Sequence, residues 1–100
     1  MLLQLALEYG PSGIRTNAIC PGPISTSLRE TSPEVLGASA PDPHQRGVGS
    51  MSPERLREVV PLGFRGSPDD VANVAVFLAA AESDYVNGHT PVVDGGWVAH

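Results

Sequence analysis

Lysine is absent from this chain of 100 residues, whose 6 basic side chains are all arginines. Aspartate and glutamate together number 11, so the formal net charge is −5. An acidic surface repels phosphate backbones and anionic lipid headgroups, which makes nucleic acid and membrane surfaces poor partners. The composition therefore excludes two large classes of binding function.

Cysteine and long apolar runs are also scarce. The single cysteine, Cys20, cannot form an internal disulfide, which fits a reducing compartment. No run approaches the ~20 apolar residues of a membrane-spanning helix. The leucine-rich start has no basic segment and no small-residue cleavage site, so it is typical of a helix rather than a signal peptide. We therefore expect a cytoplasmic protein.

Glycine and proline are abundant instead, and many of them fall in residues 24–62. A connection this long is typical of a lid, a binding loop or a disordered segment. Two short helices are predicted within it, beginning at Ser32-Pro33-Glu34 and Ser52-Pro53-Glu54. Each start has serine at the cap, proline at the first helical position and glutamate in the first turn.

The first part of the chain has the pattern of half a βαβ unit. Residues 2–9 carry apolar side chains at helical spacing. We expect Gly10 to adopt the left-handed conformation and Pro11 to end the helix. The β-branched run over residues 14–20 predicts a strand buried on both faces, as in a parallel sheet.

The last third predicts a second helix and strand. Ser67, Pro68 and two acidic residues begin a helix over residues 68–80, which is apolar on most of its surface and is expected to be buried. Residues 90–94 predict a short strand, with Pro91 at its start or edge. These elements predict an α/β fold in one domain, with a parallel sheet that is incomplete within this chain.

A Pro-Gly loop, Pro21 to Thr26, directly follows the carboxyl end of the first predicted strand. Ligands of open α/β sheets bind at these strand ends. Gly22 would allow close approach of the backbone, and the Thr26 hydroxyl would supply a hydrogen bond. A plain turn is the alternative, and the Pro-Gly pair alone favours it.

Three segments, residues 13–26, 61–72 and 85–97, resemble short-chain dehydrogenases/reductases in order and spacing. They look like that family's cofactor loop, the approach to its penultimate helix, and its last strand. The resemblance implies that residues 1–100 are the C-terminal part of a single doubly wound Rossmann-type domain that binds NAD or NADP. It covers most of the chain outside residues 27–60.

The resemblance also implies roles for particular residues. Pro21, Gly22, Ile24 and Thr26 would be the cofactor-binding residues. The Ile24 backbone would contact the nicotinamide carboxamide, and Thr26 would contact the carboxamide or the pyrophosphate. Residues 27–60 would be the variable substrate loop.

Two parts of the family pattern are missing. The family has a glycine-rich phosphate loop in its first βα turn, whereas Gly47-Val48-Gly49 here follows no predicted strand. Its chemistry needs a tyrosine with a lysine four residues later, and this chain has no lysine. We therefore expect no catalytic residue in this chain. The Tyr-Lys pair would lie just upstream of Met1.

The other residues that could form catalytic or metal sites have structural explanations. The histidines lack metal-ligand spacing, so no metal site is expected. Cys20 is predicted to be an inert packing residue, and Asp94 a turn former before two glycines. Trp97 could contact another subunit or cover the core, and the sequence leaves both open.

Three functional hypotheses follow. The first is that the chain is part of an oxidoreductase that moves a hydride between NAD(P) and an alcohol or ketone. The full-length protein would be a homo-oligomer, and the isolated chain would be inactive. The second is a non-catalytic assembly module that pairs with intact relatives through the 68–80 helix and the last strand. The third is a fragment without function.

Overall fold

The computed structural model describes residues 1–27, 37 and 51–99. Their contacts divide into two compact units. The first consists of Met1–Pro21 and Asp69–Val93, and the second of Gly22–Pro68 and Asp94–His100. No helix in the described part of the chain is both long and apolar enough to cross a membrane.

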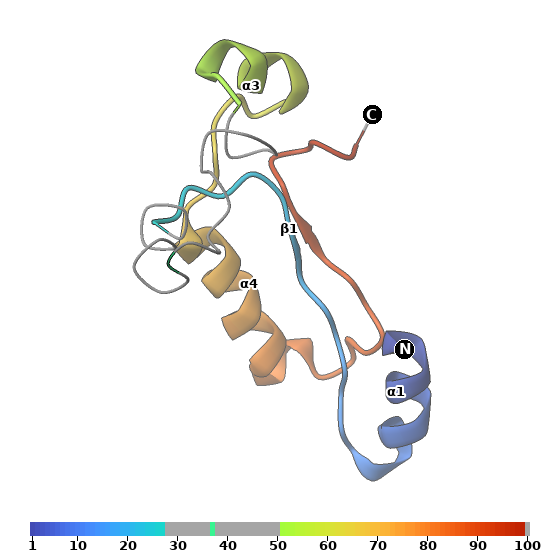
Figure 1. The fold of residues 1–100 in the computed structure, drawn as a ribbon. Helices are drawn as coiled ribbons and strands as arrows, with labels where there is room; N and C mark the ends of the chain where they lie inside the picture. Colours follow the sequence, from blue (N-terminus) through green and yellow to red (C-terminus); the bar gives the residue numbers. More distant parts are fainter. Residues whose placement is uncertain (28–36, 38–50, 100) are drawn as a thin grey trace. The chain divides into compact units, whose positions relative to one another are not determined.

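The first helix, α1, spans Leu2–Tyr9, as predicted (Figure 1). Its ending differs from the prediction. The chain continues through a 3-10 turn, η1 (Gly10–Ser12), and Gly10 has right-handed dihedral angles of −52° and −47°. Gly13 has the positive φ, 79°, and its N–H donates to the Gly10 carbonyl. Pro11 is the second residue of this turn, where a missing N–H leaves no helical hydrogen bond unmade, and the left-handed residue is Gly13.

The predicted strand over residues 14–20 is mostly wrong in extent. Strand β1 is only Cys20–Pro21, and it pairs in parallel with β2, Val92–Val93 (Figure 1). A parallel sheet is therefore present, and it is short. Cys20 is exposed, so the prediction of a buried packing cysteine is wrong as well.

Asparagine side chains take part in the pairing of the two segments before the assigned strands. Asn17 Oδ1 accepts the N–H of His89, and Asn87 Oδ1 accepts the N–H of Thr16, each at 2.9 Å. These amides take donors that a continuous ladder would give to carbonyls, a known competition between short polar side chains and regular structure. Two backbone hydrogen bonds, from the Gly88 N–H to the Thr16 carbonyl at 2.8 Å and from the Ala18 N–H to the His89 carbonyl at 3.1 Å, still join the segments there, and the assigned strands begin at Cys20 and Val92.

The helix α4 spans Pro68–Ala79, and its predicted start is confirmed. Two acidic residues, Asp69 and Asp70, stand in its first turn, where the helix dipole favours negative charge. The prediction that this helix is buried is wrong, since none of its residues is buried. Val76 is 68% exposed and Phe77 49%. Val71, Val74 and Leu78 are half-buried, so the exposed apolar surface of α4 is the part at Val76 and Phe77.

Few side chains of the described part are fully buried. In the first unit they are Ala6 and Ser83. In the second they include Leu56 and Val60, and Val60 is only 1% exposed. Each unit therefore has a very small core, and much apolar surface stays in contact with solvent. Large exposed apolar residues include Leu3, Leu7, Ile14, Leu62, Phe64, Tyr85 and Val98.

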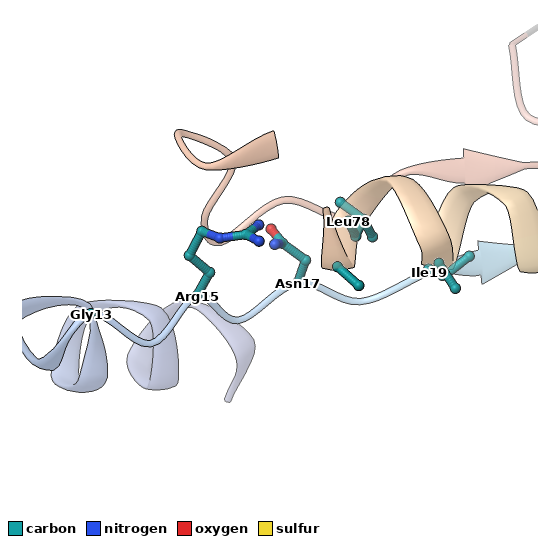
Figure 2. A pocket seen from close by; sticks show the side chains of 7 residues that line it. Gly13, Arg15, Asn17, Ile19 and Leu78 are labelled. Atoms are coloured by element: carbon teal, nitrogen blue, oxygen red, sulfur yellow. The ribbon is translucent and has the colours of Figure 1, made fainter. Parts of the chain in front are cut away.

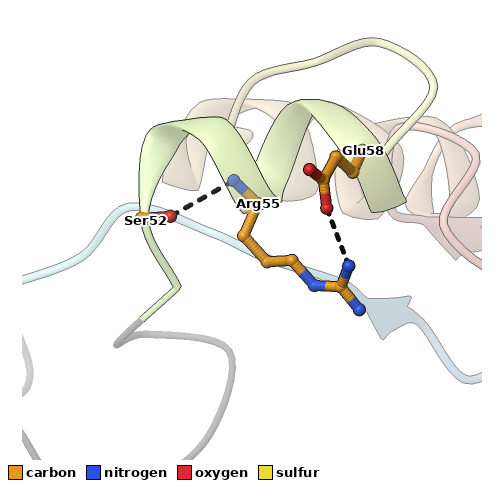
Figure 3. A network of polar contacts seen from close by, with 3 residues as sticks. All are labelled: Ser52, Arg55 and Glu58. Atoms are coloured by element: carbon orange, nitrogen blue, oxygen red, sulfur yellow. Dashed lines mark hydrogen bonds and ion pairs between the residues drawn. The ribbon is translucent and has the colours of Figure 1, made fainter.

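The helix α3 spans Pro53–Val59, as its cap sequence predicts. The Ser52 hydroxyl accepts the N–H of Arg55 at 3.2 Å, and the Arg55 guanidinium donates to Glu58 Oε2 at 2.7 Å (Figure 3). Both side chains of this ion pair are 63% exposed. The other predicted short helix, at Ser32, lies outside the described residues.

These two contacts predict unequal mutational effects. We expect Ser52→Ala to lower the free energy of unfolding by about 1 kcal/mol, because the helix loses its N-cap. Glu58→Gln should cost less than about 0.5 kcal/mol, because water screens an exposed ion pair. Urea titrations of both variants and the wild type check this. A larger loss for Glu58→Gln would contradict it.

Candidate functional site

The four predicted cofactor residues lie at the end of β1 and in the segment that follows. Pro21 pairs with Val93 in the short sheet of the first unit and is exposed. Gly22 and Ile24 belong to the second unit and are half-buried, whereas Thr26, also in the second unit, is exposed. The structure therefore presents these residues close to solvent. Nothing in their placement tests a role in cofactor binding, which stays a prediction.

Ile24 is held by a parallel bridge to Gly66. The Gly66 N–H donates to the Pro23 carbonyl at 3.0 Å, and the Ser25 N–H donates to the Gly66 carbonyl at 2.8 Å. In extended backbone, neighbouring residues direct their polar groups to opposite sides. The N–H and C=O of Ile24 itself therefore face away from Gly66.

This arrangement can bind a planar amide. An N–H and a C=O on the same edge of an extended residue match the C=O and NH₂ of a carboxamide. Backbone groups placed by a bridge also need little reordering when a ligand arrives. The residues present thus fit the nicotinamide end of a dinucleotide cofactor.

Gly22 lies against Asp94. A Cβ built on Gly22 would come within 2.5 Å of the Asp94 Cβ and 2.8 Å of its Cα. The Cα is a backbone atom and the Cβ is bonded directly to it, so a side-chain rotation cannot move either atom away. Only glycine fits at this position without a shift of the chain.

The prediction that Asp94 forms a turn is confirmed, and the contact with Gly22 adds a feature that the sequence did not suggest. Its Oδ1 accepts the Gly96 N–H and its Oδ2 accepts the Val98 N–H, both at 2.9 Å. An aspartate followed by two glycines was a sufficient signal for the turn. The neighbour of that turn, 72 residues away in the sequence, gave no signal.

The sequence also did not predict a polar cluster around Arg15 in the first unit. Arg15 Nη1 donates to the Ser83 carbonyl at 2.9 Å and to the Ser83 Oγ at 3.1 Å. Asn17 Nδ2 donates to the Val86 carbonyl at 3.0 Å. Ser83 has no exposed surface. This cluster joins the segment after η1 to the 3-10 helix η4 (Ala81–Ser83) and the turn that follows it.

An open pocket of about 490 Å³ lies beside that cluster. Figure 2 shows the polar ends of Arg15 and Asn17 close together, with Leu78 and Ile19 further along the pocket. Both polar side chains already donate to backbone carbonyls. None of the predicted cofactor residues lines this pocket. Its polar groups therefore have a structural role in joining two segments.

Comparison with known proteins extends this picture. The family model described as enoyl-(acyl carrier protein) reductase matches residues 1–98. The chain is 43% identical over 96 residues to a 2-dehydro-3-deoxy-D-gluconate 5-dehydrogenase of Bacillus subtilis. That match covers 96% of this chain and 32% of the relative.

Solved structures match the fold. A candidate 2-deoxy-D-gluconate 3-dehydrogenase of Agrobacterium tumefaciens with bound NADP has a TM-score of 0.70 and 37% identity. A 4-hydroxyisoleucine dehydrogenase in complex with NADH has a TM-score of 0.73 and 27% identity. Each comparison covers 99% of this chain and 35% of the other.

The chain thus spans about a third of the length of the relatives that it matches. The predicted α/β class, as part of a doubly wound Rossmann-type fold, is confirmed by these structures. Because the family model covers nearly the whole chain and the matched proteins are dehydrogenases, the chain belongs to the short-chain dehydrogenase/reductase family.

Proposed function

We propose that this chain is the C-terminal part of an oxidoreductase that transfers a hydride between NAD or NADP and a small alcohol or ketone. The edge of Ile24 that faces away from Gly66 is the observation that carries the proposal. It offers a carboxamide one donor and one acceptor, two residues after the close-packed Gly22. The relatives solved with NADH and NADP support the cofactor class.

The bound cofactor would supply the hydride, and this chain would hold the ring that carries it. Pro21 and Gly22 would lead the backbone to the nicotinamide, the Ile24 main chain would pair with its carboxamide, and Thr26 would contact the carboxamide or pyrophosphate. Residues 27–60 would select the substrate. We further propose a single domain, a cytoplasmic location and a homo-oligomer for the full-length protein.

The proton transfer that accompanies hydride transfer needs residues outside this chain. The family pairs a tyrosine with a lysine, and the sequence has no lysine. Tyr9 has Gly13 four residues later, and Tyr85 has His89. We therefore assign no catalytic residue to residues 1–100.

The test begins with the intact mass of the natural gene product. A mass well over twice 10.4 kDa is expected. That product should consume NADH or NADPH with a panel of ketones, and the isolated chain should not. Turnover by the isolated chain would contradict the assignment. An inactive natural product of 10.4 kDa would contradict the oxidoreductase proposal.

A second candidate, an assembly module that pairs with intact relatives, is favoured by the exposed Val76 and Phe77 of α4. Exposed apolar patches of this kind mark interaction sites or aggregation hazards. Sedimentation of the isolated chain separates the two candidates when an intact relative is added. Co-migration with the relative supports the assembly module, whereas a monomer with cooperative unfolding contradicts it.

A further inference from the structure

Gly22 and Asp94 are in such close contact that a shift of one requires a shift of the other. A Cβ on Gly22 would lie 2.5 Å from the Asp94 Cβ, a separation that real Cβ atoms do not show. A second hypothetical contact, 2.8 Å to the Asp94 Cα, involves the main chain. The backbone at Gly22 is therefore too close to the backbone at Asp94 for any side chain to fit between them.

Asp94 is itself fixed by its carboxylate. Oδ1 accepts the N–H of Gly96 and Oδ2 accepts the N–H of Val98, each at 2.9 Å. The Asp94 carbonyl also accepts the Trp97 N–H at 3.3 Å. Three acceptors on one residue thus bind the turn that follows it. Hydrogen bonds to a charged acceptor are stronger than those between neutral groups.

The far side of the turn is packed as well. A Cβ on Gly95 would meet the Val60 Cγ1 at 2.8 Å, and Val60 is 1% exposed. The Leu62 N–H donates to the Gly95 carbonyl at 3.1 Å. The turn is therefore held at Gly95 by the buried Val60 and the Leu62 N–H, and it contacts Gly22 through Asp94.

The loop that follows Gly22 is thus supported at two points. Asp94 supports it at Gly22, and Gly66 pairs with it at Ile24. We propose that Asp94 is a positioning residue, which places the Ile24 backbone for the nicotinamide carboxamide by supporting Gly22. This inference rests on the function proposed above. Asp94 does not touch the cofactor in this scheme.

A purely structural role for Asp94 makes a different prediction. Loss of general stability would weaken every part of cofactor binding equally. Loss of positioning would weaken only the contacts of the nicotinamide end. ADP-ribose has the adenosine and pyrophosphate of NADH and lacks the nicotinamide, so a comparison of the two ligands separates these roles.

The experiment measures dissociation constants of NADH and ADP-ribose for the natural gene product by calorimetry. The Asp94→Ala variant keeps the Cβ of residue 94 that contacts Gly22, and it loses the carboxylate that accepts the Gly96 and Val98 N–H groups. In Gly22→Ala, the carboxylate stays and the contact is strained. Both variants should weaken NADH roughly tenfold and ADP-ribose less than about twofold, since misplaced donors lose their hydrogen bonds.

Two further variants serve as controls. Asp94→Asn keeps one carbonyl acceptor and the size of the side chain, so it should recover most of the NADH affinity. Gly10→Ala is a matched glycine substitution in right-handed backbone, and its nearest atom would be Asn87 Nδ2 at 3.4 Å. It should leave both dissociation constants unchanged.

Equal weakening of both ligands by Asp94→Ala would overturn the positioning role, and so would unchanged NADH binding. Failure of the wild type to bind NADH more tightly than ADP-ribose would overturn the proposed function instead. Hydrogen exchange of the ligand-free protein adds a second readout. Faster exchange at the Ser25 N–H, which donates to Gly66, is expected in Asp94→Ala, and unchanged exchange there would count against the inference.

Discussion

Replacing Arg15 by methionine is expected to lower the free energy of unfolding by about 2 kcal/mol, the range for hydrogen bonds that involve a charged group. The guanidinium donates to both the carbonyl and the hydroxyl oxygen of Ser83, which is fully buried. Methionine has a similar length and keeps the packing of the stem. The lost donor leaves the Ser83 carbonyl without its charged partner. Urea unfolding of the natural gene product measures the change.

Arg57→Met is the control for this substitution. Arg57 is exposed in the last turn of α3, so its replacement should change the free energy of unfolding by less than about 0.5 kcal/mol. Arg15→Lys should lie between the two variants, since it keeps the charge and loses the planar fork. Equal effects of Arg15→Met and Arg57→Met would show that the Ser83 contacts add no stability.

Gly95→Ala is expected to cost about 2–4 kcal/mol of unfolding free energy. Gly95 has a φ of +66°, which costs an alanine roughly 1 kcal/mol. The added Cβ would also come within 2.8 Å of the Val60 Cγ1 in the core, and overpacking of this kind adds about 1–3 kcal/mol. A thermal melt and a urea titration of the natural gene product both report the loss.

Gly63→Ala separates the two contributions. Gly63 has a φ of +77°, and the nearest atom to its added Cβ would be the Arg57 Cγ at 3.7 Å. This variant has the backbone strain without the overlap, so it should lose only about 1 kcal/mol. If both glycine variants lost the same amount, the contact between Gly95 and Val60 would contribute nothing.

Signals confined to a few residues predicted the elements well. Ser52 and the proline after it begin α3, and the same pair of residue types at Ser67 begins α4. Asp94 before two glycines forms its turn. The cap of α3 and the turn at Asp94 depend on hydrogen bonds between groups that are at most four residues apart, so a short stretch of sequence contains all the participants.

Features that depend on distant partners were predicted poorly. The predicted strand over residues 14–20 is only Cys20–Pro21 in the structure, and before it the amides of Asn17 and Asn87 accept backbone N–H groups from the facing segment. Cys20 is exposed where a buried residue was expected, and none of the residues of α4 is fully buried. Apolar composition showed that these surfaces suit burial. It could not show that a neighbour was present.

The candidate site also has features that local sequence predicted and features that depend on distant partners. The Pro-Gly loop and its resemblance to a cofactor loop came from contiguous residues, and the family comparison confirmed the family to which they belong. The bridge from Ile24 to Gly66, which exposes one edge of the loop, joins residues 42 positions apart. The support of Gly22 by Asp94 joins residues still further apart.

The helix starts, the turns, the family and the lack of a lysine for acid–base chemistry within these residues can all be read from the amino-acid sequence. The available backbone edge of the loop, the need for glycine at position 22 and the carbonyls that Arg15 binds follow from the folded chain alone. The physical reason is the range of the interactions. Caps and turns close within a single turn of chain, whereas these contacts exist only after folding brings distant segments to within hydrogen-bonding distance.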